Sequence, residues 1–159
     1  MPLCAAGDHV SLDIGNLWGS PVMRDPWLNG LRVLVVEDEA VISLVVSEEL
    51  FSYGYEVAGP FGRCAEALAW LRQNNADLAI LDYQLKDGSC LPIARELNQR
   101  GIPFMVFSAS FPTHKEPPEL AGVPWIGKPA SIEALLDGLD GLTASPAAAV
   151  HFSARALTL

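Results

Sequence analysis

The sequence predicts a doubly wound α/β domain built on a five-stranded parallel sheet. Short apolar runs rich in Val, Ile and Leu recur along the chain, and longer segments with helical spacing separate them. Strands that alternate with helices form βαβ units, in which the strands run parallel and the helices cover both faces of the sheet. These crossovers are right-handed in nearly all cases, so the order of the elements leaves few topologies.

Five short apolar segments are the predicted strands. They comprise residues 31–36, 55–59, 77–82, 103–108 and 123–127. Uninterrupted apolar runs of this length are typical of strands that are buried on both faces of a sheet. The second segment has the weakest pattern of the five.

Four segments with apolar residues at helical spacing are the predicted helices. The second ends near residues 74–75, the third covers residues 89–100 and stops at Gly101, and the last begins at about Ser131. The apolar positions are Val41, Leu44, Val45 and Phe51 in the first helix, Ala65, Leu68 and Leu71 in the second, and Ile132, Leu135, Leu136 and Leu139 in the last.

The segment between the last two strands predicts that the fourth crossover helix is shortened or missing. Residues 111–122 contain Pro112, Pro117 and Pro118. Proline lacks the N–H that a helix needs and excludes its predecessor from the helical region. At most one short turn is expected, at residues 118–121.

Three segments are expected along the chain: an irregular N-terminal extension (residues 1–30), one domain (31–141) and a flexible C-terminal tail (142–159). Glycine and proline interrupt every apolar patch of the extension. Its Trp18 and Trp27 suggest docking on the domain or on a partner, although an extension with no role fits as well.

Composition excludes several functions. Half of the 159 residues are hydrophobic, 18% are charged, and the formal net charge is −9. Lys and Arg do not cluster, which argues against direct nucleic-acid binding, whereas an acidic chain suits a divalent cation or a basic partner surface. Three unpaired cysteines, no apolar span of membrane length and no signal-peptide pattern predict a cytoplasmic protein without membrane contact.

Reactive side chains follow four of the predicted strands. Asp82 follows the third, Glu37 and Asp38 the first, Ser108 the fourth and Lys128 the fifth. The carboxyl ends of parallel strands share one edge of the sheet, where ligands of open α/β sheets bind. Clustered carboxylates repel one another, so a hard cation with oxygen ligands such as Mg²⁺ is expected beside them.

Each of these residues also has an ordinary structural interpretation. Asp82 alone could be a helix cap or a turn former. The acidic residues 37–39 alone could load the first turn of a helix with favourable negative charge. Lys128 and Ser108 alone could be surface and strand-end residues. The ordered set is what favours a site.

This ordered set of motifs resembles the receiver domain of bacterial two-component response regulators, a CheY-like and flavodoxin-like (βα)5 domain, over about residues 31–141. The resemblance implies that Asp82 accepts a phosphoryl group, that Asp38, Asp82 and the Gln84 backbone carbonyl bind Mg²⁺, and that Glu37 does so through water. Lys128 and Ser108 would contact phosphoryl oxygens.

The resemblance also implies a switch and a donor. Ser108 would close on the phosphoryl group, and Trp125, where the family has Tyr or Phe, would swing inward behind it; a static Trp125 is the alternative. The phosphoryl donor would be a histidine kinase or a histidine phosphotransfer protein. The chain would then act as a stand-alone receiver through an unknown downstream protein or in a phosphorelay, and would catalyse only its own phosphorylation and dephosphorylation.

The turn at residues 86–88 and the proline after Lys128 are expected to be structural. Gly88 permits a backbone conformation that other residues avoid, and Asp87 is expected to cap the third helix. By resemblance, the Lys128–Pro129 bond is expected to be cis.

Two other functions remain open. A receiver-like docking module would bind partners without phosphorylation. A phosphohydrolase with an aspartyl-phosphate intermediate would need an acid two residues after Asp82, where Gln84 stands instead.

Overall fold

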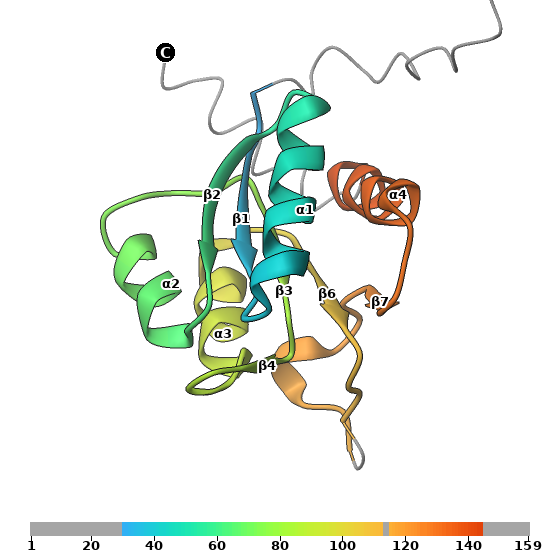
Figure 1. The fold of residues 1–159 in the computed structure, drawn as a ribbon. Helices are drawn as coiled ribbons and strands as arrows, with labels where there is room; N and C mark the ends of the chain where they lie inside the picture. The colour runs from blue at the N-terminus through green and yellow to red at the C-terminus, as the bar shows by residue number, and fades with distance from the viewer. Residues whose placement is uncertain (1–29, 113–114, 145–159) are drawn as a thin grey trace, which may run out of the picture.

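The computed structural model describes residues 30–112 and 115–144, which form a parallel sheet covered by helices (Figure 1). The strands of the main sheet are β1 (Arg32–Val36), β2 (Glu56–Phe61), β3 (Leu78–Leu81), β6 (Phe104–Ser108) and β7 (Trp125–Gly127). The helices are α1 (Ala40–Ser52), α2 (Cys64–Leu71), α3 (Leu91–Arg100) and α4 (Ile132–Thr143). A small hairpin of β4 (Gln84–Leu85) and β5 (Gly88–Ser89) and the 3-10 turn η3 (Pro118–Leu120) complete the fold.

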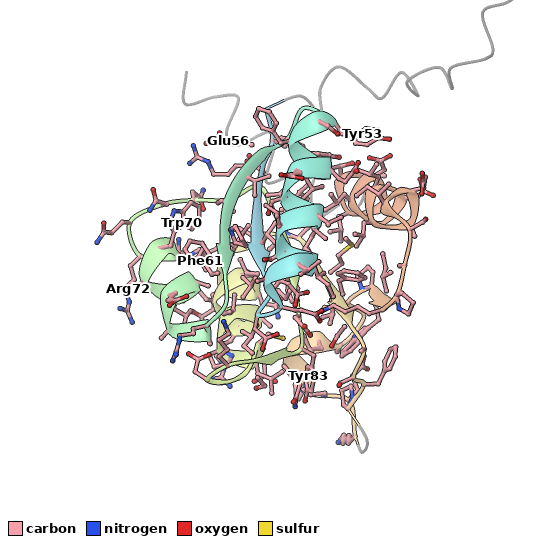
Figure 2. All side chains as sticks on the ribbon, viewed as in Figure 1. Tyr53, Glu56, Phe61, Trp70, Arg72 and Tyr83 are labelled. Atoms are coloured by element: carbon pink, nitrogen blue, oxygen red, sulfur yellow. The ribbon has the colours of Figure 1, made fainter. Side chains whose placement is uncertain are left out.

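The five strands lie in the order β2-β1-β3-β6-β7, and all neighbouring pairs are parallel. This confirms the predicted doubly wound sheet. The order reverses at β1, because the chain runs outward from β1 to β2 and then returns to β3 on the other side. A reversal of this kind separates the loops after β1 and β3 and leaves room for a ligand at the carboxyl edge. Figure 2 shows Tyr83 at this edge and Tyr53 at the opposite one.

Alternate residues of β1 face two separate hydrophobic cores. Val33 and Val35 pack with residues of α1 and α4, whereas Leu34 and Val36 pack with residues of α2 and α3. Side chains alternate between the two faces of a strand, so a run that is apolar at every position requires cover on both sides. The valine-rich β1 is therefore buried throughout most of its length.

The predicted elements are all present, with shifted ends. The second strand is Glu56–Phe61 and reaches beyond residue 59, whereas the last is only Trp125–Gly127. The second helix ends at Leu71 and not near residues 74–75, since the chain turns at Arg72. In the described residues of the proline-rich segment (111–112 and 115–122), the one helical element is the short turn η3, as predicted. The final helix begins after Ser131, whose side chain accepts a hydrogen bond from the Ala134 N–H (3.4 Å), and continues past residue 141.

The predicted role of Asp87 is wrong. Its carboxylate does not cap α3 but accepts hydrogen bonds from the backbone N–H groups of Cys64 (2.7 Å) and Ala65 (3.0 Å), at the start of α2. These two bonds lower the pKa of Asp87. The hairpin that carries Asp87 lies beside the start of α2. The sequence does not show this proximity, because the two segments are more than twenty residues apart in the chain. Gly88 has a φ of +132°, as expected for its turn.

The cysteine prediction is consistent with the part of the chain that the structure describes. Cys64 and Cys90 are buried free thiols, and burial raises the pKa of Cys90 to about 12. Cys4, Trp18 and Trp27 lie outside the described residues, as do most of the extension and of the tail. Within the described residues, no helix combines the length and the hydropathy that crossing a membrane requires.

Replacing Gly59 by Ala should destabilise the domain. Gly59 has a φ of +110°, and a Cβ atom there would lie 2.6 Å from the Val35 carbonyl oxygen. We expect Gly59→Ala to lose about 2 kcal/mol of unfolding free energy through backbone strain. Gly141 of α4 has open space around it, so Gly141→Ala should gain about 0.5 kcal/mol. Urea denaturation measures both changes, and a Gly59→Ala variant as stable as wild type would contradict the strain.

Candidate functional site

The structure brings the predicted reactive side chains together at the carboxyl edge of the sheet. Asp82 follows β3, Glu37 and Asp38 follow β1, Ser108 ends β6 and Lys128 follows β7. Glu37, Asp82 and Ser108 are buried. The acidic residues 37 and 38 precede the first turn of α1 and do not belong to it, because α1 begins at Ala40 after Glu39. The alternative interpretation, in which these acidic residues belong to the first turn of a helix, is therefore wrong for Glu37 and Asp38.

The Asp82 carboxylate has hydrogen-bond donors on both of its oxygens. Its Oδ1 accepts from the Ser108 hydroxyl (2.6 Å) and from the Gln84 backbone N–H (3.3 Å). Its Oδ2 accepts from the Lys128 ammonium group (2.6 Å). A buried carboxylate must be compensated in this way, because leaving it without partners would be costly.

Lys128 serves two carboxylates at once. Its Nζ lies 2.5 Å from Glu37 Oε2 and 2.6 Å from Asp82 Oδ2, and 5.3 Å from the centroid of the Phe107 ring. Burial by itself would lower the pKa of Lys128, but the hydrogen bonds to Asp82 and Glu37 outweigh it and raise that pKa. Lys128 is thus a cation at neutral pH. The bond from Lys128 to Pro129 is cis, as expected.

Glu37, Asp38 and Asp82 form an acidic cluster that could hold a metal ion. One carboxylate oxygen from each lies within 4.8 Å of the others. Burial raises the pKa of Glu37, and the hydrogen bond from Lys128 offsets this only in part. The donors are all hard carboxylate oxygens, the type that Mg²⁺ prefers, and Asp38 is only half-buried, which leaves the cluster accessible. The residues present therefore fit Mg²⁺.

Trp125 contacts two aromatic rings. Its ring stacks on Phe111, with centroids 4.9 Å apart, and meets Tyr83 at 5.7 Å. Phe111 comes from the proline-rich segment after β6, and Tyr83 directly follows Asp82. Sequence reasoning did not single out Phe111 or Tyr83. Their aromatic character next to Ser108 and Asp82 was the available signal, but only the fold shows that both reach Trp125.

Comparison with known proteins agrees with this geometry. Residues 33–140 match the response regulator receiver domain family.

The chain belongs to this family.

Curated and solved relatives support the assignment. Over 112 residues, the chain is 28% identical to the transcriptional regulatory protein PdtaR of Mycobacterium tuberculosis, a match that covers 69% of the chain and 55% of PdtaR. The chain therefore spans about half the length of the curated relatives that it matches.

Among solved structures, the response regulator TrrA of Thermotoga maritima in complex with Mg²⁺–BeF is similar, with 26% identity and a TM-score of 0.62 over 70% of this chain and 98% of that one. A chain in the complex of histidine kinase ThkA with TrrA is also similar, at 26% identity and a TM-score of 0.60, over 70% and 97% of the two chains. The receiver fold of the chain is thus supported by sequence and by structure.

Removing the shared ammonium group should destabilise this receiver domain. Lys128→Met leaves Glu37 and Asp82 buried without their cation, and we expect a loss of about 3 kcal/mol in unfolding free energy, the low end for breaking a buried ion pair, since the carboxylates can take up protons. Urea denaturation in the presence of a chelator measures it.

Two controls make this result interpretable. Lys86→Met removes an exposed lysine and should change stability little, whereas adding Asp82→Asn to Lys128→Met should recover part of the loss. A Lys128→Met variant as stable as Lys86→Met would contradict the proposed compensation.

Proposed function

We propose that Asp82 accepts a phosphoryl group, with Ser108 and Lys128 assisting, and that the receiver domain then signals by changing its protein contacts. The observation that carries this proposal is the pair of donors on Asp82. Ser108 and Lys128 hold opposite oxygens of a buried carboxylate at 2.6 Å each. Both groups could therefore stabilise the negative charge that develops on the oxygens of a transferred phosphoryl group.

The reaction is a displacement at phosphorus. One Asp82 oxygen attacks the phosphorus atom of a phosphohistidine, the bond from phosphorus to the imidazole nitrogen breaks, and imidazole leaves with the electron pair. Phosphoryl transfer depends mostly on positioning and charge neutralisation. The Lys128 ammonium group and the Ser108 hydroxyl now donate hydrogen bonds to Asp82. After transfer, each would donate its hydrogen bond to a phosphoryl oxygen instead.

Mg²⁺ is the cofactor that we propose for this step. Asp38, Asp82 and the Gln84 backbone carbonyl would ligate it, with Glu37 acting through water. When bound, the ion would neutralise charge on the phosphoryl oxygens and on the carboxylates. Supporting observations are the close acidic cluster and the similarity to TrrA in complex with Mg²⁺–BeF.

A histidine kinase, or a histidine phosphotransfer protein, is the proposed donor. Support comes from the similarity to a chain of the ThkA–TrrA complex, which joins a histidine kinase to a response regulator. The proposed signal then reaches a downstream protein through changed contacts of the domain. A role within a phosphorelay is equally compatible with the site.

Trp125 and Ser108 form the proposed switch. Ser108 Oγ donates to Asp82 and also accepts from the Ser110 N–H at 3.2 Å, which couples the site to the segment that carries Phe111. Phe111 in turn stacks on Trp125. If Ser108 moves onto a phosphoryl oxygen, the backbone at Ser110 and the aromatic stack can respond.

The alternatives are less well supported by the site. A docking module would have no need to keep Ser108 and Lys128 directed at a buried Asp82. A phosphohydrolase would need an acid to protonate its leaving group, and Gln84 cannot serve as one.

Phosphorylation should require Asp82. Acetyl phosphate with Mg²⁺, or a cognate kinase, should add the mass of one phosphoryl group to wild type and none to Asp82→Asn, because the amide is a poor nucleophile. A chelator should abolish the gain. Asp87→Asn is the matched control and should be phosphorylated like wild type. Intact-protein mass spectrometry is the readout, and no mass gain from either donor would contradict the proposal.

The aromatic stack should respond to a phosphoryl mimic through Ser108. In a chain with Trp18, Trp27 and Trp70 replaced by Phe, beryllofluoride with Mg²⁺ should change the fluorescence of Trp125. Ser108→Val removes the hydroxyl and should abolish the change, while Ser110→Ala, which keeps the backbone N–H, should not. A change that persists in Ser108→Val would show that the two residues are not coupled.

A further inference from the structure

A lysine that has no ion-pair partner among the described residues lies beside the acidic cluster. Lys86 is exposed at the turn of the β4–β5 hairpin. No carboxylate of residues 30–112 or 115–144 lies within 4.0 Å of its ammonium group. Lys128 differs in this respect, because Glu37 and Asp82 both contact it. Lys86 can therefore act on nearby carboxylates only through its electric field.

The hairpin turn that carries Lys86 is held against the loop after β2. The Lys86 N–H donates to the Gly62 carbonyl (3.3 Å), and the Asp87 carboxylate accepts from the first residues of α2. The loop is held in turn to the end of β1, because the Glu37 N–H donates to the Phe61 carbonyl (2.9 Å). The backbone at Lys86 thus has a fixed place next to the acidic cluster.

Gly62 lets Lys86 approach Asp38. A Cβ atom at Gly62 would lie 3.5 Å from Lys86 Nζ, 3.8 Å from Lys86 Cδ and 3.7 Å from Asp38 Cα. The lysine side chain therefore lies along the bare backbone of Gly62, and its ammonium group and the Asp38 main chain are within 4 Å of one point. Asp38 is only half-buried, whereas the other two carboxylates of the cluster are buried.

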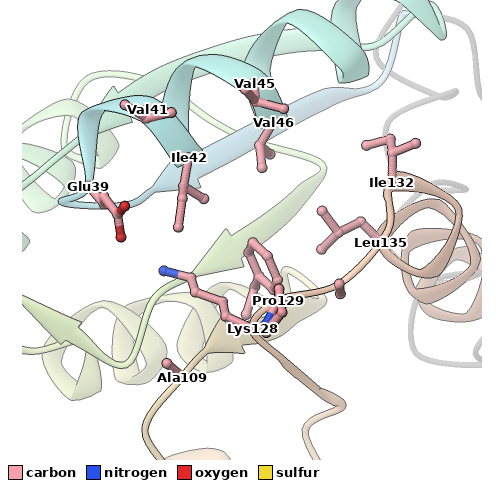
Figure 3. A pocket seen from close by; sticks show the side chains of 12 residues that line it. Glu39, Val41, Ile42, Val45, Val46, Ala109, Lys128, Pro129, Ile132 and Leu135 are labelled. Atoms are coloured by element: carbon pink, nitrogen blue, oxygen red, sulfur yellow. The ribbon is translucent and has the colours of Figure 1, made fainter.

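The acidic cluster thus has a cation on either side along the sheet. Its residues follow β1 and β3, which lie between β2 on one side and β6 and β7 on the other. Lys128 follows β7 and lines the groove between α1 and α4; Figure 3 shows its side chain extending toward the start of α1, where Glu39 lies. Lys86 approaches from the β2 side, next to Asp38.

We propose that Lys86 sets the affinity of the acidic cluster for divalent cations. Its positive charge offsets part of the carboxylate charge, and it repels a dication that binds among those carboxylates. Lys86 therefore weakens Mg²⁺ binding, and the domain needs a higher Mg²⁺ concentration before Asp82 can accept a phosphoryl group. The inference rests on the proposed function and names the residue that tunes its metal site.

The size of the effect follows from charge and distance. A dication and a single positive charge about 8 Å apart in water repel each other enough to change an affinity about fourfold at low salt. Because Lys86 is exposed, dissolved ions screen this repulsion, and at about 1 M salt the Debye length is only about 3 Å. A change in packing would not depend on salt in this way.

The test measures the binding of Mn²⁺, a divalent ion that suits the same oxygen ligands, from the electron paramagnetic resonance of the free ion, with MgCl2 as competitor. In about 0.01 M salt, Lys86→Met should bind both ions about fourfold more tightly than wild type, and Lys86→Glu more tightly still. Lys86→Arg keeps the charge and should match wild type. The differences should vanish at about 1 M salt.

Arg72→Met is the matched control. Arg72 is exposed and caps the end of α2, whose first residues contact the hairpin. Eight helical residues rise about 12 Å, so this variant loses the same charge much farther from the cluster. It should change the affinity for Mn²⁺ less than twofold at about 0.01 M salt.

The outcomes separate this inference from the proposed site. If wild type binds Mn²⁺, Asp38→Asn loses it and Lys86→Met binds as wild type does, the role of Lys86 is overturned and the proposed function stands. A Lys86→Met difference that persists at about 1 M salt would also overturn it. No binding in wild type, or full binding in Asp38→Asn, would overturn the metal site itself. Circular dichroism checks that each variant keeps the fold.

Discussion

The arrangement of the site depends on one ammonium group shared by two buried carboxylates. Lys128 lies between Glu37 and Asp82, which come from the ends of β1 and β3. Either carboxylate alone would be costly to bury at this edge of the sheet, and each stays there because the same cation meets it. The contact also ties the loop after β7 to the centre of the sheet.

The proline-rich segment changes what surrounds this ion pair. A full crossover helix would occupy the space beside β7, but η3 is only a short turn, and the segment before it places Phe111 on Trp125. The tryptophan thus has two aromatic partners, Phe111 and Tyr83.

Helix α1 has a buried side and an exposed side, and both carry apolar residues. Its inner side packs on the sheet through small and branched residues, and its N-terminal end adjoins the acidic cluster. Its outer side carries most of the exposed apolar side chains of the described residues. A helix that is apolar nearly all round has more to bury than one sheet face can cover, so a further contact is expected on physical grounds.

The sequence alone determined the element order, the parallel sheet, the loss of the fourth crossover helix and the set Glu37, Asp38, Asp82, Ser108 and Lys128. These follow from local properties: hydrophobic period, proline chemistry and the rule that parallel strands end at one edge. Only the tertiary structure decided that Asp87 caps α2, that Phe111 and Tyr83 contact Trp125, and that the predicted apolar positions of α1 face outward. The first two contacts join segments that are distant in the chain. Hydrophobic periodicity identifies which residues share one side of a helix, but it does not show whether that side faces the core or the solvent.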